Sequence, residues 1–313
     1  AEDIKMPGLV HAVLVRSPHP HARIVSIDVA PALAVPGVLH ALTAADIPGR
    51  NSLEGYSRDE PLLNPAGGSV RMLGDAVGLV IAASPDTALA GAAAVAVVYE
   101  PLPHVYDARD AVEDGAPRVH DDGNLLSSYE ILYGNLDEVM AQADEVVETH
   151  YFTPFIEHAA LERESVLGYV EHVEAGPGGT AGKRIVVVGG HQEPHWAQGW
   201  IAQMLGLPLD QVRVITPPTG GAFGGKQDPW PLMAGALAAY HARRPVRLVY
   251  TRSESFAASP KRHPYRMDYR VGATRDGRLT GLHLRILANT GAYDCDGWYI
   301  PQYALVALSL IHI

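Results

Sequence analysis

The stretch PPTGGAFGGKQD, residues 217–228, combines glycines, a lysine and polar residues at a spacing that could bind an anion. Gly220, Gly225 and Lys226 match the G-x-x-x-x-G-K part of a phosphate-binding P-loop, but Gln227 stands where that motif has Ser or Thr. Without a hydroxyl there, the loop has no Mg²⁺ ligand, and it also lacks the dinucleotide-binding G-x-G-x-x-G spacing. The loop is therefore a poor candidate for a nucleoside triphosphate site.

The predicted elements on either side place this loop between a strand and a helix. The alternating stretch QVRVITP predicts a strand that ends just before the loop, and a helix is predicted from Pro229, with Asp228 as its cap. Backbone N–H groups in a glycine-rich turn beside a helix N-terminus form a concave donor site for anions or oxo groups. A tight turn with a purely structural role is the alternative that the spacing leaves open.

Two pairs of histidines resemble metal-binding patterns. His191 and His195 in HQEPHW are four residues apart, as in H-E-x-x-H zinc sites, but the acid between them is out of place and Pro194 marks a helix start. We therefore predict no zinc site. His19 and His21 lie in the proline-bounded turn SPHPHAR, where alternate side chains need not converge, and we expect both to be solvated.

The stretch FIEHAALERES carries four ionisable groups: Glu157, His158, Glu162 and Glu164. Paired carboxylates can serve acid–base catalysis. A loop between two predicted strands more often carries such charges as a solvated rim, so we assign these residues no catalytic role.

The composition predicts an acidic, soluble chain with a substantial core. Of 313 residues, 47% are apolar and 19% charged, and the formal net charge of −11 argues against a nucleic-acid partner. Cys295, the only cysteine, permits no internal disulfide and cannot supply the thiolates of an iron–sulfur cluster. No apolar run approaches the ~20 residues that cross a bilayer, and the first residues do not resemble a secretory signal. We expect a cytoplasmic protein without a membrane partner.

Strand and helix patterns predict two α+β units, residues 1–112 and 144–307, joined by a linker. The linker, 113–143, loses the apolar periodicity and is rich in Gly, Pro, Asp and Asn. The strand-like stretches are LVHAVLVRS, ARIVSIDVA, GVLHAL, DAVGLVIAA, VAVVYEPL, EVVETHYFTP, SVLGYVEHV, RIVVVGG, QVRVITP, PVRLVYT and the two halves of a hairpin that turns at Asp276-Gly277. Helices are predicted from Pro85, capped by Ser84, and from Pro194, where Trp196, Trp200, Ile201, Met204 and Leu205 share an apolar face; a Gly/Pro turn covers 175–182.

Both ends of the sequence look cut. It starts without an initiator Met, and the last six residues, LSLIHI, resemble the translation of a transposon end used in preparing sequencing libraries. Our hypothesis is that 308–313 is an adapter-derived tail and not part of the fold. Source DNA that continues in frame through these codons would refute it.

Two motifs of this sequence, in the same order as in that family, resemble the molybdopterin-binding subunit of the xanthine dehydrogenase and aldehyde oxidase family. GGAFGGKQ is similar to that family's G-G-x-F-G-G-K loop, and GGHQEPHW places Gln192 at the end of an earlier strand. The likeness covers nearly the whole chain. It implies an α+β fold, with an α/β-hammerhead domain at 1–112 followed by the first part of the molybdenum-cofactor-binding domain at 144–307.

The resemblance implies a molybdenum hydroxylase. Such enzymes hydroxylate an electron-poor carbon with oxygen from water, and two electrons leave through [2Fe–2S] clusters to FAD. The single cysteine cannot hold these clusters, so they must come from a partner subunit or from a region outside this sequence. We expect a separate iron–sulfur subunit and a separate FAD subunit in a hetero-oligomer, with a single fused polypeptide as the alternative; whether the assembly dimerises stays open. The expected cofactor is molybdopterin, and its cytosine dinucleotide form is one option.

The resemblance also assigns residues. Gln192 is expected beside an oxo ligand of the molybdenum and Phe223 to approach through its backbone N–H, neither as a direct ligand, because the pterin dithiolene binds the metal. The expected cofactor-binding set is Gln192, Gly221, Ala222, Phe223, Gly224 and Gly225, and Gln227 is expected to face the substrate. The family's general-base Glu and a substrate-binding Arg lie downstream of this sequence. We therefore expect residues 1–313 alone to be inactive and to hold no stoichiometric molybdenum.

Two departures from the family pattern leave the substrate open. Gln227 is Glu in many purine-oxidising members, and a neutral amide cannot carry a proton near neutral pH; some bacterial purine-type members also have Gln. Arg163 stands where the family usually has Pro after Leu-Glu, which leaves the shape of that loop open. A xanthine dehydrogenase-like activity is our leading hypothesis. The alternatives are an aldehyde, another N-heterocycle or carbon monoxide as substrate, or a non-catalytic anion- or nucleotide-binding module.

Overall fold

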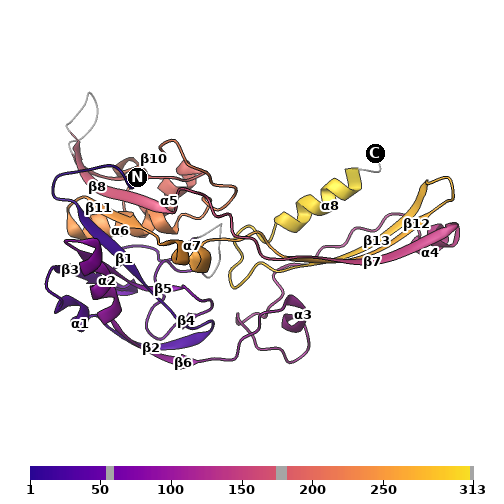
Figure 1. Cartoon of the computed structure of the whole chain (residues 1–313), viewed down its shortest axis with the longest axis horizontal. Coiled ribbons are helices and arrows are strands. Elements are labelled where there is room, and N and C mark those ends of the chain that lie inside the picture. Colours follow the sequence, from indigo (N-terminus) through magenta and orange to yellow (C-terminus); the bar gives the residue numbers. More distant parts are fainter. Residues whose placement is uncertain (54–59, 174–181, 311–313) are drawn as a thin grey trace. The chain divides into compact units, whose positions relative to one another are not determined.

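The computed structural model describes residues 1–53, 60–173 and 182–310 and divides the chain into two compact units (Figure 1). Unit 1 comprises Ala1–Leu102 and Glu157–Pro260, and unit 2 comprises Pro103–Ile156 and Lys261–Ile313. The chain leaves unit 1, builds part of unit 2, returns to unit 1 and ends in unit 2. The domain limits proposed from the sequence, at 112 and 144, stay a prediction.

Unit 1 is built on a seven-stranded mixed sheet of order β10-β9-β8-β11-β1-β5-β3. Its strands are β1 (Val10–Arg16), β3 (Val38–Leu42), β5 (Ala76–Ala82), β8 (Ser165–Val173), β9 (Gly182–Gly189), β10 (Val212–Ile215) and β11 (Val246–Val249). Strand β1 pairs with β11 in parallel, Val10 opposite Val246, and with β5 in antiparallel fashion. The early and late parts of the sequence therefore share one sheet.

A second, three-stranded sheet of order β4-β2-β6 belongs to the same unit. It contains β2 (Ala22–Asp28), β4 (Ser69–Val70) and β6 (Ala96–Pro101), accompanied by helices α1 (Ala30–Leu33) and α2 (Pro85–Ala94) and the 3₁₀ turn η1 (Ala44–Asp46). Helix α2 begins as predicted, since the Ser84 side chain accepts a hydrogen bond from the Thr87 N–H and Pro85 occupies the first turn.

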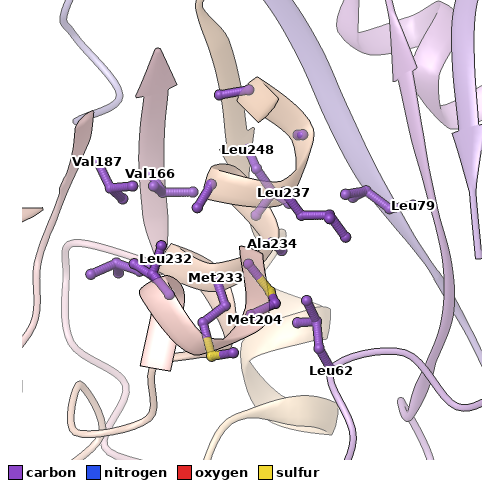
Figure 2. Packing of buried hydrophobic residues seen from close by; sticks show 14 of the residues in the cluster. Leu62, Leu79, Val166, Val187, Met204, Leu232, Met233, Ala234, Leu237 and Leu248 are labelled. Atoms are coloured by element: carbon purple, nitrogen blue, oxygen red, sulfur yellow. The ribbon is translucent and has the colours of Figure 1, made fainter. Parts of the chain in front are cut away.

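Helix α6 (Trp230–Ala242) is the centre of the unit 1 core. Every residue from Trp230 to Ala239 is buried, and a helix that is apolar all round is stable only inside a core. Figure 2 shows Met233 and Leu237 of this helix packed among side chains that include Leu248 and Met204. The remaining helices of the unit are α5 (Pro194–Leu205), α7 (Arg252–Ala258) and the 3₁₀ turn η2 (Leu209–Gln211). Because α6 directly follows residues 217–228, its burial fixes one end of that loop.

Unit 2 contains a three-stranded antiparallel sheet of order β13-β12-β7. Its elements are β7 (Glu145–Thr153), β12 (Tyr265–Ala273), β13 (Leu279–Ala288), α3 (Ala108–Ala111), α4 (Leu136–Ala141) and α8 (Ile300–Leu310). The predicted hairpin is confirmed, with Gly277 at φ +88° between β12 and β13. The predicted linker contains α4, whose first N–H groups are capped by Asn135.

The α+β class is confirmed, but three details of the sequence prediction are wrong. Helix α6 begins at Trp230, one residue after the predicted start, with Pro229 in the N-cap position; the Asp228 side chain still accepts a hydrogen bond from the first helical N–H, that of Trp230, at 3.3 Å. Trp196 is 61% exposed, whereas the four other residues of the predicted face are buried.

The third detail concerns the histidine turn. His21 is buried rather than solvated, since it leads into β2, where its carbonyl accepts the Leu102 N–H. Of the predicted turn at 175–182, residues 175–181 lie outside the described residues, and Gly182 is the first residue of β9. Within the described part of the chain, no helix is long and apolar enough to cross a membrane.

Candidate functional site

The glycine loop at 217–228 and the Gln192 segment meet because their strands are parallel neighbours. Strands β9 and β10 pair in parallel, from Ile185 opposite Val212 to Val188 opposite Ile215, and α5 connects them. The carboxyl ends of parallel neighbours lie at the same edge of a sheet, where α/β proteins commonly bind ligands. Residues 190–193 and 217–228 therefore lie side by side.

Gln192 is fastened to the loop by two hydrogen bonds. Its backbone N–H donates to the Lys226 carbonyl at 2.8 Å, and its side-chain Oε1 accepts from the Gly224 N–H at 3.1 Å. Because a backbone N–H can only donate, the atom facing Gly224 must be the amide oxygen. The amide NH₂ of this exposed side chain is left to donate elsewhere.

The loop backbone has an unusual conformation around Phe223. Phe223 has a φ of +56°, Gly221 +105° and Gly224 +94°. A non-glycine residue in this region costs of order 1–3 kcal/mol and is held there only by its surroundings. The 75% exposed Phe223 ring covers Gly221, where an added Cβ would lie 2.9 Å from the ring atom Cε2.

Three consecutive backbone N–H groups of the loop are available to bind an anion or oxo ligand. Those of Gly221, Ala222 and Phe223 donate no hydrogen bond to any described residue, whereas the next ones do: Gly224 to Gln192 and Gly225 to the Ala222 carbonyl. Positive φ on both sides of Ala222 is the alternation that turns successive N–H groups toward one concave face.

The carboxylate of Glu162 fastens the start of the loop. It accepts a hydrogen bond from the Gly220 N–H through Oε2, and its other oxygen lies 3.5 Å from Lys226 Nζ. The Glu162 N–H in turn donates to the Gly220 carbonyl at 3.4 Å. The expectation of a solvated rim is wrong here, because Glu162 is bonded to both ends of the glycine-rich segment.

Other residues of the 157–164 segment also pack against the loop or anchor the segment. The His158 ring lies under the loop, where a Cβ on Gly225 would be 2.9 Å from its Nδ1. Glu164 accepts from the Ser255 hydroxyl, and Arg252 donates to the Ala160 carbonyl at 2.6 Å. No local pattern predicts these contacts, since their partners lie far along the chain.

Arg163, which departs from the family pattern, points to a different partner. Its guanidinium donates to Glu2 at 2.9 Å, while the neighbouring Glu162 keeps its bonds to the loop.

Gln227 is half-buried, and its N–H donates to the Gly224 carbonyl at 3.4 Å. Its expected role toward a substrate stays a prediction.

His191 is buried directly behind Gln192. Its Nδ1 accepts a hydrogen bond from the Glu193 N–H at 2.9 Å. Burial lowers the pKa of His191 to about 4, although a backbone hydrogen bond with Gln227 opposes part of this shift. The imidazole is therefore neutral at physiological pH.

Residues 1–53, 60–173 and 182–310 contain no group of three His, Cys, Asp or Glu side chains that could hold a metal ion.

The low pKa of His191 predicts a loss of stability in acid. Between pH 6.5 and 4 the unfolded chain binds a proton that the folded chain excludes, so the free energy of unfolding falls as the pH drops through this window. At 1.36 kcal/mol per unit, the loss at pH 4.5 relative to pH 7 should be about 2–3 kcal/mol. His191→Asn, whose carbonyl can still accept from Glu193, should lack this part of the loss. Urea unfolding of both proteins at the two pH values measures the difference, and equal losses would contradict the prediction.

Comparison with known proteins identifies the class to which this fold and site belong. Residues 1–103 match the model of the aldehyde oxidase and xanthine dehydrogenase a/b hammerhead domain, and residues 119–311 match that of the molybdopterin cofactor-binding domain. These are the two domains of a molybdenum-cofactor subunit, in the predicted order. The chain belongs to the xanthine dehydrogenase and aldehyde oxidase family of molybdenum-containing oxidoreductases.

Individual relatives agree with this assignment. The chain is 38% identical to the nicotinate dehydrogenase large molybdopterin subunit of Eubacterium barkeri, over 95% of this chain and 67% of the relative. It is 35% identical to the xanthine dehydrogenase molybdenum-binding subunit of Escherichia coli O157:H7, over 96% of this chain and 40% of the relative. Among solved structures, the aldehyde oxidoreductase of Desulfovibrio gigas matches with a TM-score of 0.79 and 28% identity, over 90% of this chain and 31% of that one. The chain thus spans only part of each.

Proposed function

We propose that this chain is the cofactor-binding part of a xanthine dehydrogenase-like molybdenum hydroxylase that acts on an N-heteroaromatic ring. The single observation that carries the proposal is the hydrogen bond from the Gly224 N–H to Gln192 Oε1. This bond turns the Gln192 amide so that its NH₂ group is available as a donor beside the open N–H groups of Gly221, Ala222 and Phe223. Such a cluster of donors is suited to the oxo ligands of a metal cofactor.

The front of the loop has room for a bulky group that is bound by the backbone of the loop. A Cβ at Gly220 would meet the Glu162 side chain at 2.9 Å, and one at Gly225 would meet His158 at the same distance, so the back of the loop is filled. Its other side presents Gly221 and Ala222, half-buried, and Phe223, exposed. These residues and Gln192 would hold the molybdopterin cofactor. When bound, the cofactor supplies the two-electron redox chemistry that hydroxylation with water requires.

The chain's own residues bind and orient rather than carry protons. Gln192 would donate through its amide NH₂ to an oxo ligand of the bound cofactor, and the Phe223 N–H would donate to it from the loop. Gln227 can donate to and accept from a heterocycle's ring nitrogen or carbonyl, but its amide does not titrate. The buried His191 imidazole is already neutral and does not exchange protons near pH 7. The general base would come from another part of the enzyme.

The relatives with higher identity support the proposed substrate class. The two relatives at 38% and 35% identity are named for nicotinate and xanthine, which are both N-heteroaromatic rings, whereas the aldehyde oxidoreductase shares 28%. Both of those relatives are also named as subunits of larger enzymes. We extend the proposal to a hetero-oligomer in which [2Fe–2S] and FAD subunits accept the electrons. The cytosine dinucleotide form of the cofactor remains one option.

A substrate panel tests this proposal. The complete enzyme, assayed with a dye acceptor, should reduce the dye faster with xanthine or nicotinate than with an aldehyde or carbon monoxide. Its molybdenum content should be close to one per cofactor subunit by metal analysis. A faster rate with the aldehyde or carbon monoxide would overturn the substrate class. A metal-free protein that binds a nucleotide, and loses that binding in Lys226→Ala, would instead support a non-catalytic binding module.

A further inference from the structure

A small cavity lies behind the glycine loop, within unit 1. It offers about 10 Å³ to the centre of a water-sized sphere, close to the minimum that one water molecule requires. Lys226, Ser165, Glu164 and Asp228 contribute polar groups to its wall, together with Gly225 from the loop and Tyr250, which directly follows β11. Pro231 and Leu232 complete the wall, so the cavity has both polar and apolar sides and is no larger than a single water.

Two buried polar groups in this wall lack a hydrogen-bond partner among the described residues: Lys226 Nζ and Ser165 Oγ. Lys226 is 4% exposed and Ser165 5% exposed, so bulk water does not reach them freely. Lys226 Nζ has only the Glu162 carboxylate nearby, at 3.5 Å, which is too long for a good charged hydrogen bond. Leaving such groups unsatisfied destabilises the fold, and the penalty is larger for a charged group than for a neutral one.

We propose that the cavity binds one internal water molecule that bridges Lys226 Nζ and Ser165 Oγ. The water accepts from Lys226, shares a hydrogen bond with the Ser165 hydroxyl and has a proton left for a carboxylate in the wall. Internal waters typically make about three such bonds. One small molecule thereby satisfies both groups.

The bridge makes Lys226 a positioning residue for the loop. Ser165 is the first residue of β8 and pairs with Val249 in the main sheet, so it is a fixed point. Lys226 directly follows Gly225, and its carbonyl accepts the Gln192 N–H. Through the water, the far end of the Lys226 side chain is tied to the sheet, while Glu162 ties it to Gly220. These contacts hold the loop on the side of the cavity, and they do not involve the ligand on its other side. The inference therefore does not depend on the proposed function.

High-resolution crystallography and hydrogen exchange on the full-length protein test the proposal. We expect an electron-density peak within hydrogen-bond distance of both Lys226 Nζ and Ser165 Oγ. In Ser165→Ala and in Lys226→Met, we expect peptides covering 217–228 to exchange at least tenfold faster, while those covering α6 stay unchanged. Lys183→Met, which removes an exposed lysine on β9, is the matched control and should leave the loop unchanged.

Each outcome decides the matter. Density at the bridge and faster exchange in both variants support the proposal. A cavity without a density peak would overturn the water site. Faster exchange in Lys226→Met with unchanged exchange in Ser165→Ala would mean that Lys226 acts through Glu162 alone, which would also overturn the bridge. Ser165→Ala removes one hydroxyl and leaves the apolar core intact, so it keeps the test valid even if Lys226→Met does not fold.

Discussion

Gln192→Glu in the complete, molybdenum-loaded enzyme should lower kcat by about 10²-fold, with little change in molybdenum content. The carboxylate has the shape of the amide and can still accept the Gly224 N–H, which donates to Oε1 at 3.1 Å in the native side chain. What it lacks is the NH₂ donor. Removing one preorganised donor from a reacting centre typically costs 10²–10³-fold, and removing an outer partner of a metal ligand about 10–100-fold.

Two further variants separate the loss of the Gln192 NH₂ donor from the loss of its hydrogen bond to Gly224. Gln192→Ala loses both the donor and the bond to Gly224, so we expect lower molybdenum content in addition to the loss of kcat. Gln203→Ala removes an exposed glutamine from α5 and should change neither. Steady-state rates normalised to molybdenum measure all three. Native turnover per molybdenum in Gln192→Glu would show that the amide is not a donor to the metal centre.

The meeting of Gln192 and the glycine loop could be anticipated from the sequence. The order strand, helix, strand predicts parallel neighbours, and each motif follows one of these strands. The carboxyl ends of β9 and β10 therefore had to lie at one edge. The direction of the Gln192 side chain could not be derived in this way, because it depends on a single hydrogen bond to Gly224.

The contacts of Glu162 and His158 could not be predicted from local patterns. A carboxylate in a polar loop usually points into solvent, and periodicity says nothing about partners that lie distant in sequence. Glu162 instead meets Gly220 and Lys226, because β8 lies next to β9 in the sheet and brings the preceding loop to the same edge. The same limit applies to β1, whose position between β11 and β5 no local pattern indicates.

Gly221→Ala should reduce molybdenum content to less than a tenth of the native value and abolish most of the turnover with it. The φ of +105° at this residue is open to glycine but strained for alanine, at a cost of order 1–3 kcal/mol. The added Cβ would also lie 2.9 Å from the Phe223 ring. To relieve the backbone strain and the close contact with the ring, the loop must change its conformation. This change moves the N–H groups of Gly221, Ala222 and Phe223 that we propose as donors to the cofactor.

Gly67→Ala is the matched control for that variant. Gly67 also belongs to unit 1 and has a φ of +82°, but nothing lies within 4 Å of a Cβ placed there. Both substitutions should therefore cost stability of order 1 kcal/mol or more through backbone strain, and both proteins should fold. Only Gly221→Ala should lose molybdenum. Equal molybdenum contents in the two purified variants, at comparable thermal stability, would mean that the cofactor does not depend on the conformation of this loop, and the loop would then have to be regarded as a structural turn.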